Sequence, residues 1–166
     1  FAVLESAVVR YTITGVIPGP LGSAHPSITP LESFRTSDSW IIIAAGNDML
    51  WARLCRVLGR DDLVRDPRFE NNNVRTENRA ELSGIIGAEM AKRTTAEWIS
   101  ICEQADIPHS RINNIQEICE DPVIRHRGML VTVDQPNVGP VRIAGSPIRL
   151  SETPGRVDSP APLLGE

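Results

Sequence analysis

Residues 25–51 read HPSITPLESFRTSDSWIIIAAGNDMLW, and this stretch predicts a hairpin followed by a capped helix. Leu31–Arg35 and Trp40–Ala45 flank a Ser-Asp-Ser turn, which is the pattern of two paired strands. The second segment is a continuous apolar run, so we expect it to be buried on both faces. Gly46 then ends the strand, and Asn47 is a residue type that is favoured at a helix N-cap. The stretch therefore predicts strand, strand and helix in direct succession.

Toward the N-terminus, the sequence predicts a helix and then a loop. Apolar residues recur at helical spacing from Phe1 to about Thr12, and Gly15 follows as a helix stop. Residues 15–30 are rich in Gly and Pro and have no clear helix or strand pattern. A loop of this length in a compact domain is usually a functional segment or a linker. The loop at residues 15–30 is therefore expected to be either a functional segment or a linker between two domains.

Toward the C-terminus, helical patterns come first. The helix after Asn47 ends at Gly59, and a longer helix is expected from about Asn73 to Lys92. Gly84 and Gly87 in this longer helix suggest close packing against a neighbour. The region after the hairpin is therefore predicted to be mainly helical.

Capping patterns and then strand patterns complete the chain. Thr94 and Glu97 form a capping box that opens a helix. Two short helices are predicted next, one capped by Asn114 and one that begins at Asp121 and Pro122. Strands or extended segments are expected at 129–134, 141–144 and 148–151, and a Pro- and Gly-rich segment at 154–162.

The order of these elements predicts an α+β fold with a small, mostly antiparallel sheet and helices on one side. We expect residues 1–30 to be a linker helix and loop that come from another domain, residues 31–150 to form the small α+β domain, and residues 151–166 to be an extended linker. The chain begins with Phe1 inside an apolar segment, so we expect a piece of a longer protein.

Composition narrows the classes of partner. The net charge is −4, which argues against a nucleic-acid-binding surface. The 17 basic residues are almost all Arg, which suits carboxylates and phosphates, so anionic small molecules remain candidate partners. No signal-peptide pattern and no apolar run of about 18 residues is present, so no membrane partner is expected.

The three cysteines match neither a zinc site nor a disulfide framework, so no metal is expected and a cytoplasmic location fits. Cys55 and Cys102 fall on apolar positions of predicted helices and should be buried.

The sequence contains no stand-alone catalytic motif, so candidate site residues come from loops and helix starts. Gly19 and Gly22 allow the backbone to approach a thioester or carboxylate oxygen, or they only make the loop flexible. His25, in the same loop, is the histidine best placed to face a ligand. Asn47 and Asp48 start a helix at the end of a buried strand, where they serve as a ligand contact or as a plain cap.

Arg75 and Arg79 lie one turn apart in the predicted long helix. We expect them to form salt bridges with Glu77, Glu81 or the acidic segment 66–70. A contact with a phosphate group is the alternative.

Four segments of the chain, in this order, resemble the family III CoA-transferases. They are HPSITPLESFRTSDSWIIIAAGND, WARLCRVLGRDDLVRDPRFENNNVRTENRAEL, TTAEWISICEQADIPHSRINNIQEICEDPVIRHRGML and GSPIRLSETPGRVDSPAPLLGE. Each segment alone is a weak motif, whereas their order and spacing together are specific. The resemblance covers nearly the whole chain.

The resemblance implies a longer protein in which a Rossmann-like domain binds CoA and the chain then crosses to a small α+β domain. It also implies that two chains interlock as a homodimer. The nucleophile of the family is an Asp in the N-terminal domain, and no residue here matches its motif, so no catalytic residue is expected in this chain. Coenzyme A or acyl-CoA would be a substrate rather than a bound cofactor, and a carboxylic acid the second partner. The small domain would close over the site and exclude water, and this chain alone would be inactive.

Two other functions remain open from the sequence. The α-methylacyl-CoA racemases share the fold and carry a Glu near the start of the helix after the second strand. Asn47 occupies that location here, which favours a transferase. The other alternative is a truncated, non-catalytic domain that binds a partner or dimerises.

Overall fold

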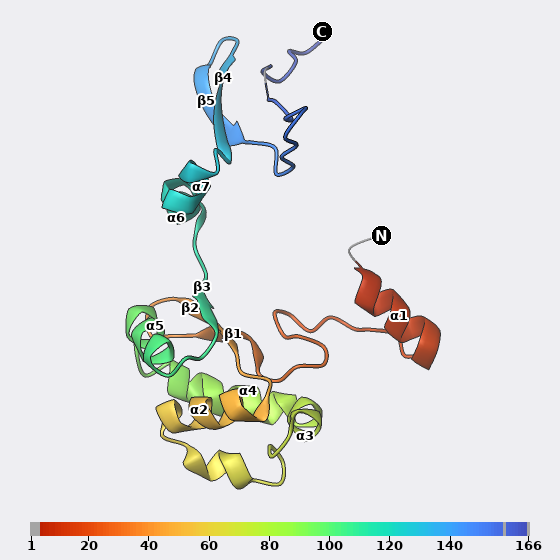
Figure 1. The fold of residues 1–166 in the computed structure, drawn as a ribbon, viewed down its shortest axis with the longest axis vertical. Coiled ribbons are helices and arrows are strands. Elements are labelled where there is room, and N and C mark those ends of the chain that lie inside the picture. The colour runs from red at the N-terminus through yellow and green to blue at the C-terminus, as the bar shows by residue number, and fades with distance from the viewer. Residues whose placement is uncertain (1–3, 158, 166) are drawn as a thin grey trace. The chain divides into compact units, whose positions relative to one another are not determined.

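A computed structural model of the chain describes residues 4–157 and 159–165. The chain forms two compact units, and they are described separately (Figure 1). Unit 1 ends at Ile112 and unit 2 begins at Asn113. The domain boundaries expected after residues 30 and 150 remain predictions.

Unit 1 contains most of the helices. Its elements are α1 (Glu5–Thr14), β1 (Leu31–Arg35), β2 (Trp40–Ala44), α2 (Asp48–Leu58), the 3-10 helix η2 (Asp61–Arg65), α3 (Asn72–Glu77), α4 (Arg79–Met90), α5 (Thr95–Gln104) and β3 (His109–Arg111).

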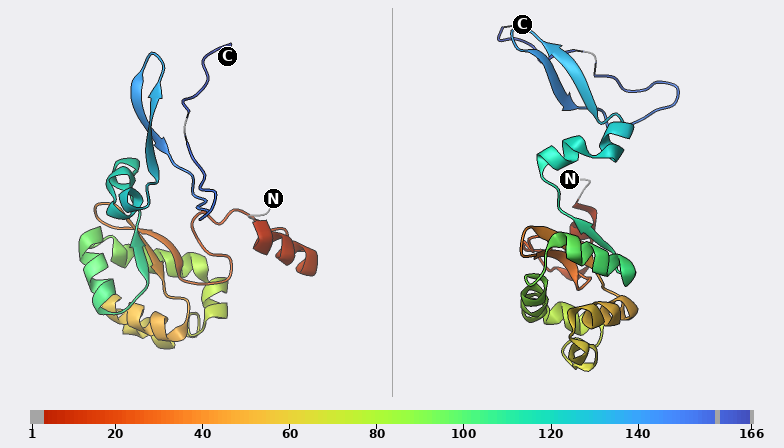
Figure 2. Two further views of the ribbon diagram at one scale, coloured as in Figure 1. Left: turned by 45° about the horizontal axis from the view of Figure 1, so that its top comes forward. Right: turned by 90° about the vertical axis from the view of Figure 1, so that its left-hand side faces the viewer.

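The strands of unit 1 form one antiparallel sheet in the order β1-β2-β3. Phe34 on β1 pairs with Ile41 on β2, and Ile43 pairs with His109 on β3. Helix α4 packs against β1, α5 packs against β3, and α2 packs on α4 (Figure 2). The buried side chains of these elements form one hydrophobic core, to which Trp51 and Trp98 belong. The predicted α+β class with a small antiparallel sheet is confirmed.

The prediction that the second strand is buried on both faces is wrong. Ile41 and Ile43 are buried in the core, whereas Ile42 and Ala44 on the opposite face are half-buried and Trp40 is exposed. The helices cover one face of this sheet, so a continuous apolar run here has the alternating burial of a one-sided sheet.

The single helix expected from residue 73 to 92 is in fact two helices. Helix α3 ends at Glu77, and α4 begins at Arg79. Between them the side-chain N–H of Asn78 donates to Val74 O at 3.0 Å and to Arg68 O at 3.2 Å, so it competes with the helical backbone. The expected close packing at Gly84 and Gly87 is also wrong, because a Cβ at either position would meet no atom within 4 Å.

The predicted cap of α5 and the predicted stop of α1 are confirmed. Thr94 and Glu97 form the predicted capping box of α5. Gly15 ends α1 in the left-handed conformation and donates its N–H to Tyr11 O at 2.8 Å. Residues 1–3 of the predicted first helix lie outside the described residues.

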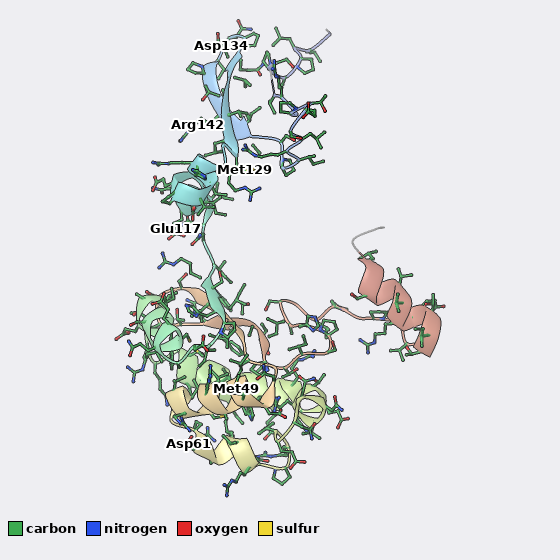
Figure 3. All side chains as sticks on the ribbon, in the orientation of Figure 1. Met49, Asp61, Glu117, Met129, Asp134 and Arg142 are labelled. Carbon is green, nitrogen blue, oxygen red and sulfur yellow. The ribbon has the colours of Figure 1, made fainter. Side chains whose placement is uncertain are left out.

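Unit 2 contains α6 (Ile115–Glu120), α7 (Pro122–His126), β4 (Leu130–Gln135) and β5 (Gly139–Ala144). The two strands pair antiparallel around a turn in which Asn137 has a φ of 65°. Asp134 and Arg142 lie on the exposed face of this hairpin, whereas Val133 on the other face is buried (Figure 3). Residues 148–151 form no strand, and the described residues after Ala144 contain no helix or strand.

The structure also bears on membrane-spanning helices and on the cysteines. No helix among them is long and apolar enough to cross a membrane. Cys55 and Cys102 are buried free thiols, as predicted.

Candidate functional site

A groove of about 850 Å³ opens on unit 1 where the end of β2 meets the starts of α2 and α3. Its volume is within the range of small-molecule sites. Its apolar lining consists of Ile28, Leu31, Ala44, Leu50 and Pro108. Its polar lining consists of Asn47, Asp48, Asn71, Asn72 and Asn73. Four stretches of the sequence, at residues 28–31, 44–50, 71–73 and at Pro108, therefore contribute to one candidate site.

Two asparagines of the groove are helix N-caps. Asn47 Oδ1 accepts a hydrogen bond from Leu50 N at 2.8 Å and caps α2. Asn71 Oδ1 accepts from Asn73 N at 3.0 Å and from Val74 N at 3.2 Å, and it caps α3. Capping by a side-chain oxygen satisfies backbone N–H groups that the helix leaves unpaired. The predicted cap role of Asn47 is thus present, and the cap lies in a groove.

Below the groove, Arg75 joins the segments that form it. Its guanidinium is fully buried and donates to Thr29 O at 2.9 Å, to Phe69 O at 3.0 Å and to Gly46 O at 2.8 Å. It also donates to Asp48 Oδ1 at 3.0 Å. Its bonds therefore tie the loop before β1, the end of β2, the start of α2 and the loop before α3 to one point.

The environment of Arg75 compensates for its burial. The guanidinium carbon lies 5.3 Å from the ring centroid of Trp51, a distance at which a cation is attracted to an indole ring. A buried charge without such partners would be strongly destabilising. Asp48 is only the exposed end of this arrangement, since 70% of its side chain is accessible.

The ion pairs predicted for the two arginines are wrong. Arg75 binds backbone carbonyls and Asp48 instead of the expected acids. Arg79 Nη2 donates to His25 O at 2.7 Å and, more weakly, to Thr29 Oγ1 at 3.4 Å. Glu81 pairs with Arg68. Both arginines therefore fix the loop before β1 rather than bridge the surface of their own helices.

Gly46 is required where the loop crosses the groove. A Cβ added there would lie 2.1 Å from Ile28 Cγ2, far inside contact distance. Asn72 holds the same loop, because its Nδ2 donates to Ser27 O at 2.8 Å and its Oδ1 accepts from Thr29 N at 3.0 Å. The wall formed by Ile28 thus depends on a glycine at the end of β2.

The other predicted site residues lie on the loop before β1 and do not line the groove. Gly19 and Gly22 are exposed, and Gly22 has a φ of +62°, which favours glycine. His25 is half-buried, and its Nδ1 accepts from Ser27 N at 3.2 Å. The structure therefore brings together Asn47 and Asp48, and it leaves Gly19, Gly22 and His25 outside that groove.

Strongly shifted pKa values belong to structural contacts outside the groove. Hydrogen bonds from the side chain and the backbone of Arg68 lower the pKa of Asp66 to about 2. Burial raises the pKa of Cys55 to about 12 and that of Cys102 to about 11, so neither thiol is a ready nucleophile. No group of three or more potential metal ligands occurs in residues 4–157 and 159–165.

Sequence reasoning missed Asn71 as a lining residue and Arg75 as the buried residue that joins the segments of the groove. The pattern Asn71-Asn72-Asn73 before a helical segment is a signal for an N-cap. No local signal identifies Arg75, because its partners Thr29 and Gly46 are 46 and 29 positions away along the chain.

The comparisons with known proteins agree on one family. The model of CoA-transferase family III matches residues 1–166. Succinyl-CoA:glutarate CoA-transferase of Mus musculus is 33% identical over 99% of this chain and 38% of its own length. Succinate–glutarate CoA-transferase of Agrobacterium fabrum is 36% identical over 99% of this chain and 41% of its own length.

A solved structure supports the same assignment. A CaiB/BaiF family protein from Brucella suis superposes with a TM-score of 0.77 at 31% identity, over 98% of this chain and 42% of that one. The chain thus spans about two fifths of the length of the relatives it matches. The resemblance predicted from the sequence is confirmed, and the chain belongs to CoA-transferase family III.

Proposed function

We propose that this chain is part of an enzyme that transfers CoA from an acyl-CoA to a carboxylic acid. The observation that carries the proposal is the match to the family over residues 1–166, together with relatives named for the transfer of CoA between succinyl-CoA and glutarate. Other relatives are named for D-citramalate, oxalate and mesaconate. All of these acceptors are dicarboxylic acids, so a small dicarboxylate is the proposed acceptor here.

Within this enzyme, the chain would cover the active site. Asn47 and Asp48 in the groove, and Gly19, Gly22 and His25 on the loop, are the proposed contacts with acyl-CoA. Enclosure of the site would keep water from a reactive acyl intermediate. Residues 1–30 would lead from a CoA-binding domain, residues 31–150 would form the cover, and residues 151–166 would return toward that domain.

The nucleophile is proposed to lie outside these 166 residues. The groove has one carboxylate, that of Asp48, and Arg75 already binds it at 3.0 Å. A carboxylate nucleophile would have to be free to attack a thioester carbon. The enzyme is further proposed to be an interlocked homodimer in the cytoplasm, and this chain alone to be inactive.

The test compares the product of the whole gene that encodes this chain with the 166-residue chain. Each is incubated with succinyl-CoA and glutarate, and the CoA thioesters are separated by chromatography and identified by mass. We expect glutaryl-CoA to form only with the whole gene product.

Three results would contradict the proposal. Thioester turnover by the 166-residue chain would place the nucleophile within it. Loss of α-stereochemistry in a 2-methylacyl-CoA without acyl exchange would identify a racemase. No reaction of the whole gene product with any acyl-CoA and dicarboxylate pair would leave a non-catalytic domain.

A further inference from the structure

We propose that the groove formed by β2, α2 and α3 binds an uncharged, carbonyl-bearing segment of acyl-CoA, with the side-chain N–H groups of Asn47 and Asn71 as donors. The inference rests on the proposed function and identifies which part of that substrate this groove takes. The free carboxylate of the acceptor is not proposed to bind in this groove.

The first argument is the orientation of the two amides. An asparagine amide carries an acceptor oxygen and a donor nitrogen, and only its hydrogen bonds determine which way it points. The cap bonds occupy Oδ1 of Asn47 and Oδ1 of Asn71. Neither amide can turn over without losing its cap, so each keeps its Nδ2 as a donor. Neither Nδ2 has a hydrogen-bond partner among the described residues, and both residues line the groove.

The second argument is charge. The lining contains Asp48 and no Lys, Arg or His. Arg75, which contacts the lining residue Asp48, is fully buried and already donates to three carbonyls and to that carboxylate. Asp48 also occupies the first turn of α2, where it offsets the positive end of that helix. A second carboxylate would find no free cation in the lining, whereas a neutral carbonyl would accept from the two amides.

The third argument is the apolar remainder of the lining. Ile28, Leu31 and Leu50 offer contact area for methylene and methyl groups between polar points. A chain in which carbonyls alternate with short aliphatic segments matches this mixture. CoA supplies such chemistry from two sources, namely the amides of its pantetheine arm and the thioester carbonyl itself.

The experiment observes the two donors directly. The side-chain NH₂ signals of Asn47 and Asn71 are followed by nuclear magnetic resonance in the 166-residue chain labelled with nitrogen-15. The chain is titrated separately with pantetheine, with S-ethyl thioacetate and with glutarate. We expect both signals to shift with at least one of the uncharged probes and to stay unchanged with glutarate. A shift with pantetheine would indicate that the groove binds the amides of the pantetheine arm, and a shift with S-ethyl thioacetate that it binds the thioester carbonyl.

Two substitutions separate binding from folding. Asn47→Asp and Asn71→Asp keep the capping oxygen and remove the N–H donor, since Asp caps a helix as well as Asn does. Each should weaken binding of the uncharged probe about tenfold, as the new oxygen repels a carbonyl. Asn114, which caps α6 in unit 2 through Glu117 N at 2.9 Å, is the matched control. Its amide signal should not respond, and Asn114→Asp should bind as the unchanged chain does.

Distinct outcomes would overturn the inference. Shifts of the two amides with glutarate alone would make the groove a carboxylate site. Absence of any shift up to the solubility limit of the probes, or full binding by both substituted chains, would remove the two donors from recognition. These results do not depend on turnover, so the inference can fail while the enzyme assay still shows CoA transfer.

Discussion

The two units differ in what holds them together. Unit 1 has a core of buried apolar side chains and, beside it, the fully buried Arg75 that ties distant backbone segments together. In the described part of unit 2, Val133 is the one buried apolar side chain, and the hairpin depends on strand pairing and its turn. A two-stranded hairpin alone is only marginally stable. The groove is therefore built on the unit whose geometry is fixed by many long-range contacts, which suits a binding site.

The largest expected effect is that of Arg75→Ala. It leaves the carbonyls of Thr29, Phe69 and Gly46 without their buried donor, so we expect the free energy of unfolding to fall by about 3–5 kcal/mol. Urea unfolding measures this change. Arg142→Ala, at an exposed position of β5 in unit 2, is the control and should stay within about 0.5 kcal/mol. Equal effects at the two sites would erase the contrast between the units.

The next effect concerns thiol reactivity in the two units. Burial raises the pKa of Cys55 from 9.0 to about 12 and that of Cys102 from 9.0 to about 11, whereas Cys119 in unit 2 is only half-buried. Only the thiolate reacts with iodoacetamide. An increase of two units in the pKa of a thiol lowers the amount of thiolate about 100-fold. At pH 8 we expect Cys55 and Cys102 to be alkylated at least about 100 times more slowly in the folded chain than in urea, and we expect Cys119 to be labelled first because it is the more exposed cysteine. Mass spectrometry of the digested chain reads out each site.

Two further results would sharpen this comparison. In urea all three cysteines should react alike. In the unfolded chain the thiols ionise near their ordinary pKa of 9.0, while Cys55 and Cys102 stay neutral in the folded chain. Stability should therefore be unaffected by these thiols below pH 9 and should fall as the pH rises further. Rapid labelling of Cys55 in the folded chain would show that the core of unit 1 opens readily.

A smaller effect is expected where a glycine shapes the groove. Gly46→Ala brings a Cβ to 2.1 Å from Ile28 Cγ2, and we expect it to cost about 1–3 kcal/mol of unfolding free energy. Gly84→Ala is the matched control, because α4 leaves open space there, and it should stabilise by about 0.5–1 kcal/mol. In thermal unfolding we expect the melting temperature to fall for Gly46→Ala and to rise for Gly84→Ala. The double substitution Ile28→Ala with Gly46→Ala should recover the loss if the contact is its cause.

The smallest effect is that of Asp48→Asn. It removes the carboxylate from Arg75 but keeps an acceptor oxygen, and 70% of the Asp48 side chain is exposed. We expect a change below about 1 kcal/mol that shrinks further in high salt. A loss as large as that of Arg75→Ala would mean that the carboxylate, rather than the three carbonyls, holds the guanidinium in place.

Local signals in the sequence predicted most of the elements correctly. The capping box of Thr94 and Glu97, the N-cap Asn47 and the stop at Gly15 are where they were expected. Each of these depends on residues within one helical turn of one another, so the sequence alone contains the interaction. The break at Asn78 was missed because its side chain also binds Arg68 O, ten positions away.

The sequence by itself determined the α+β class, the hairpin of residues 31–44 and the family of this protein, because turn residues, caps and segment order are written locally along the chain. Only the tertiary structure decided that β3 pairs with β2 and that one face of β2 is not fully buried. It also decided that Arg75 binds the segments that form the groove. These features arise from pairing between residues that are tens of positions apart. Such pairing follows from how the whole core packs and has no signature in any single segment.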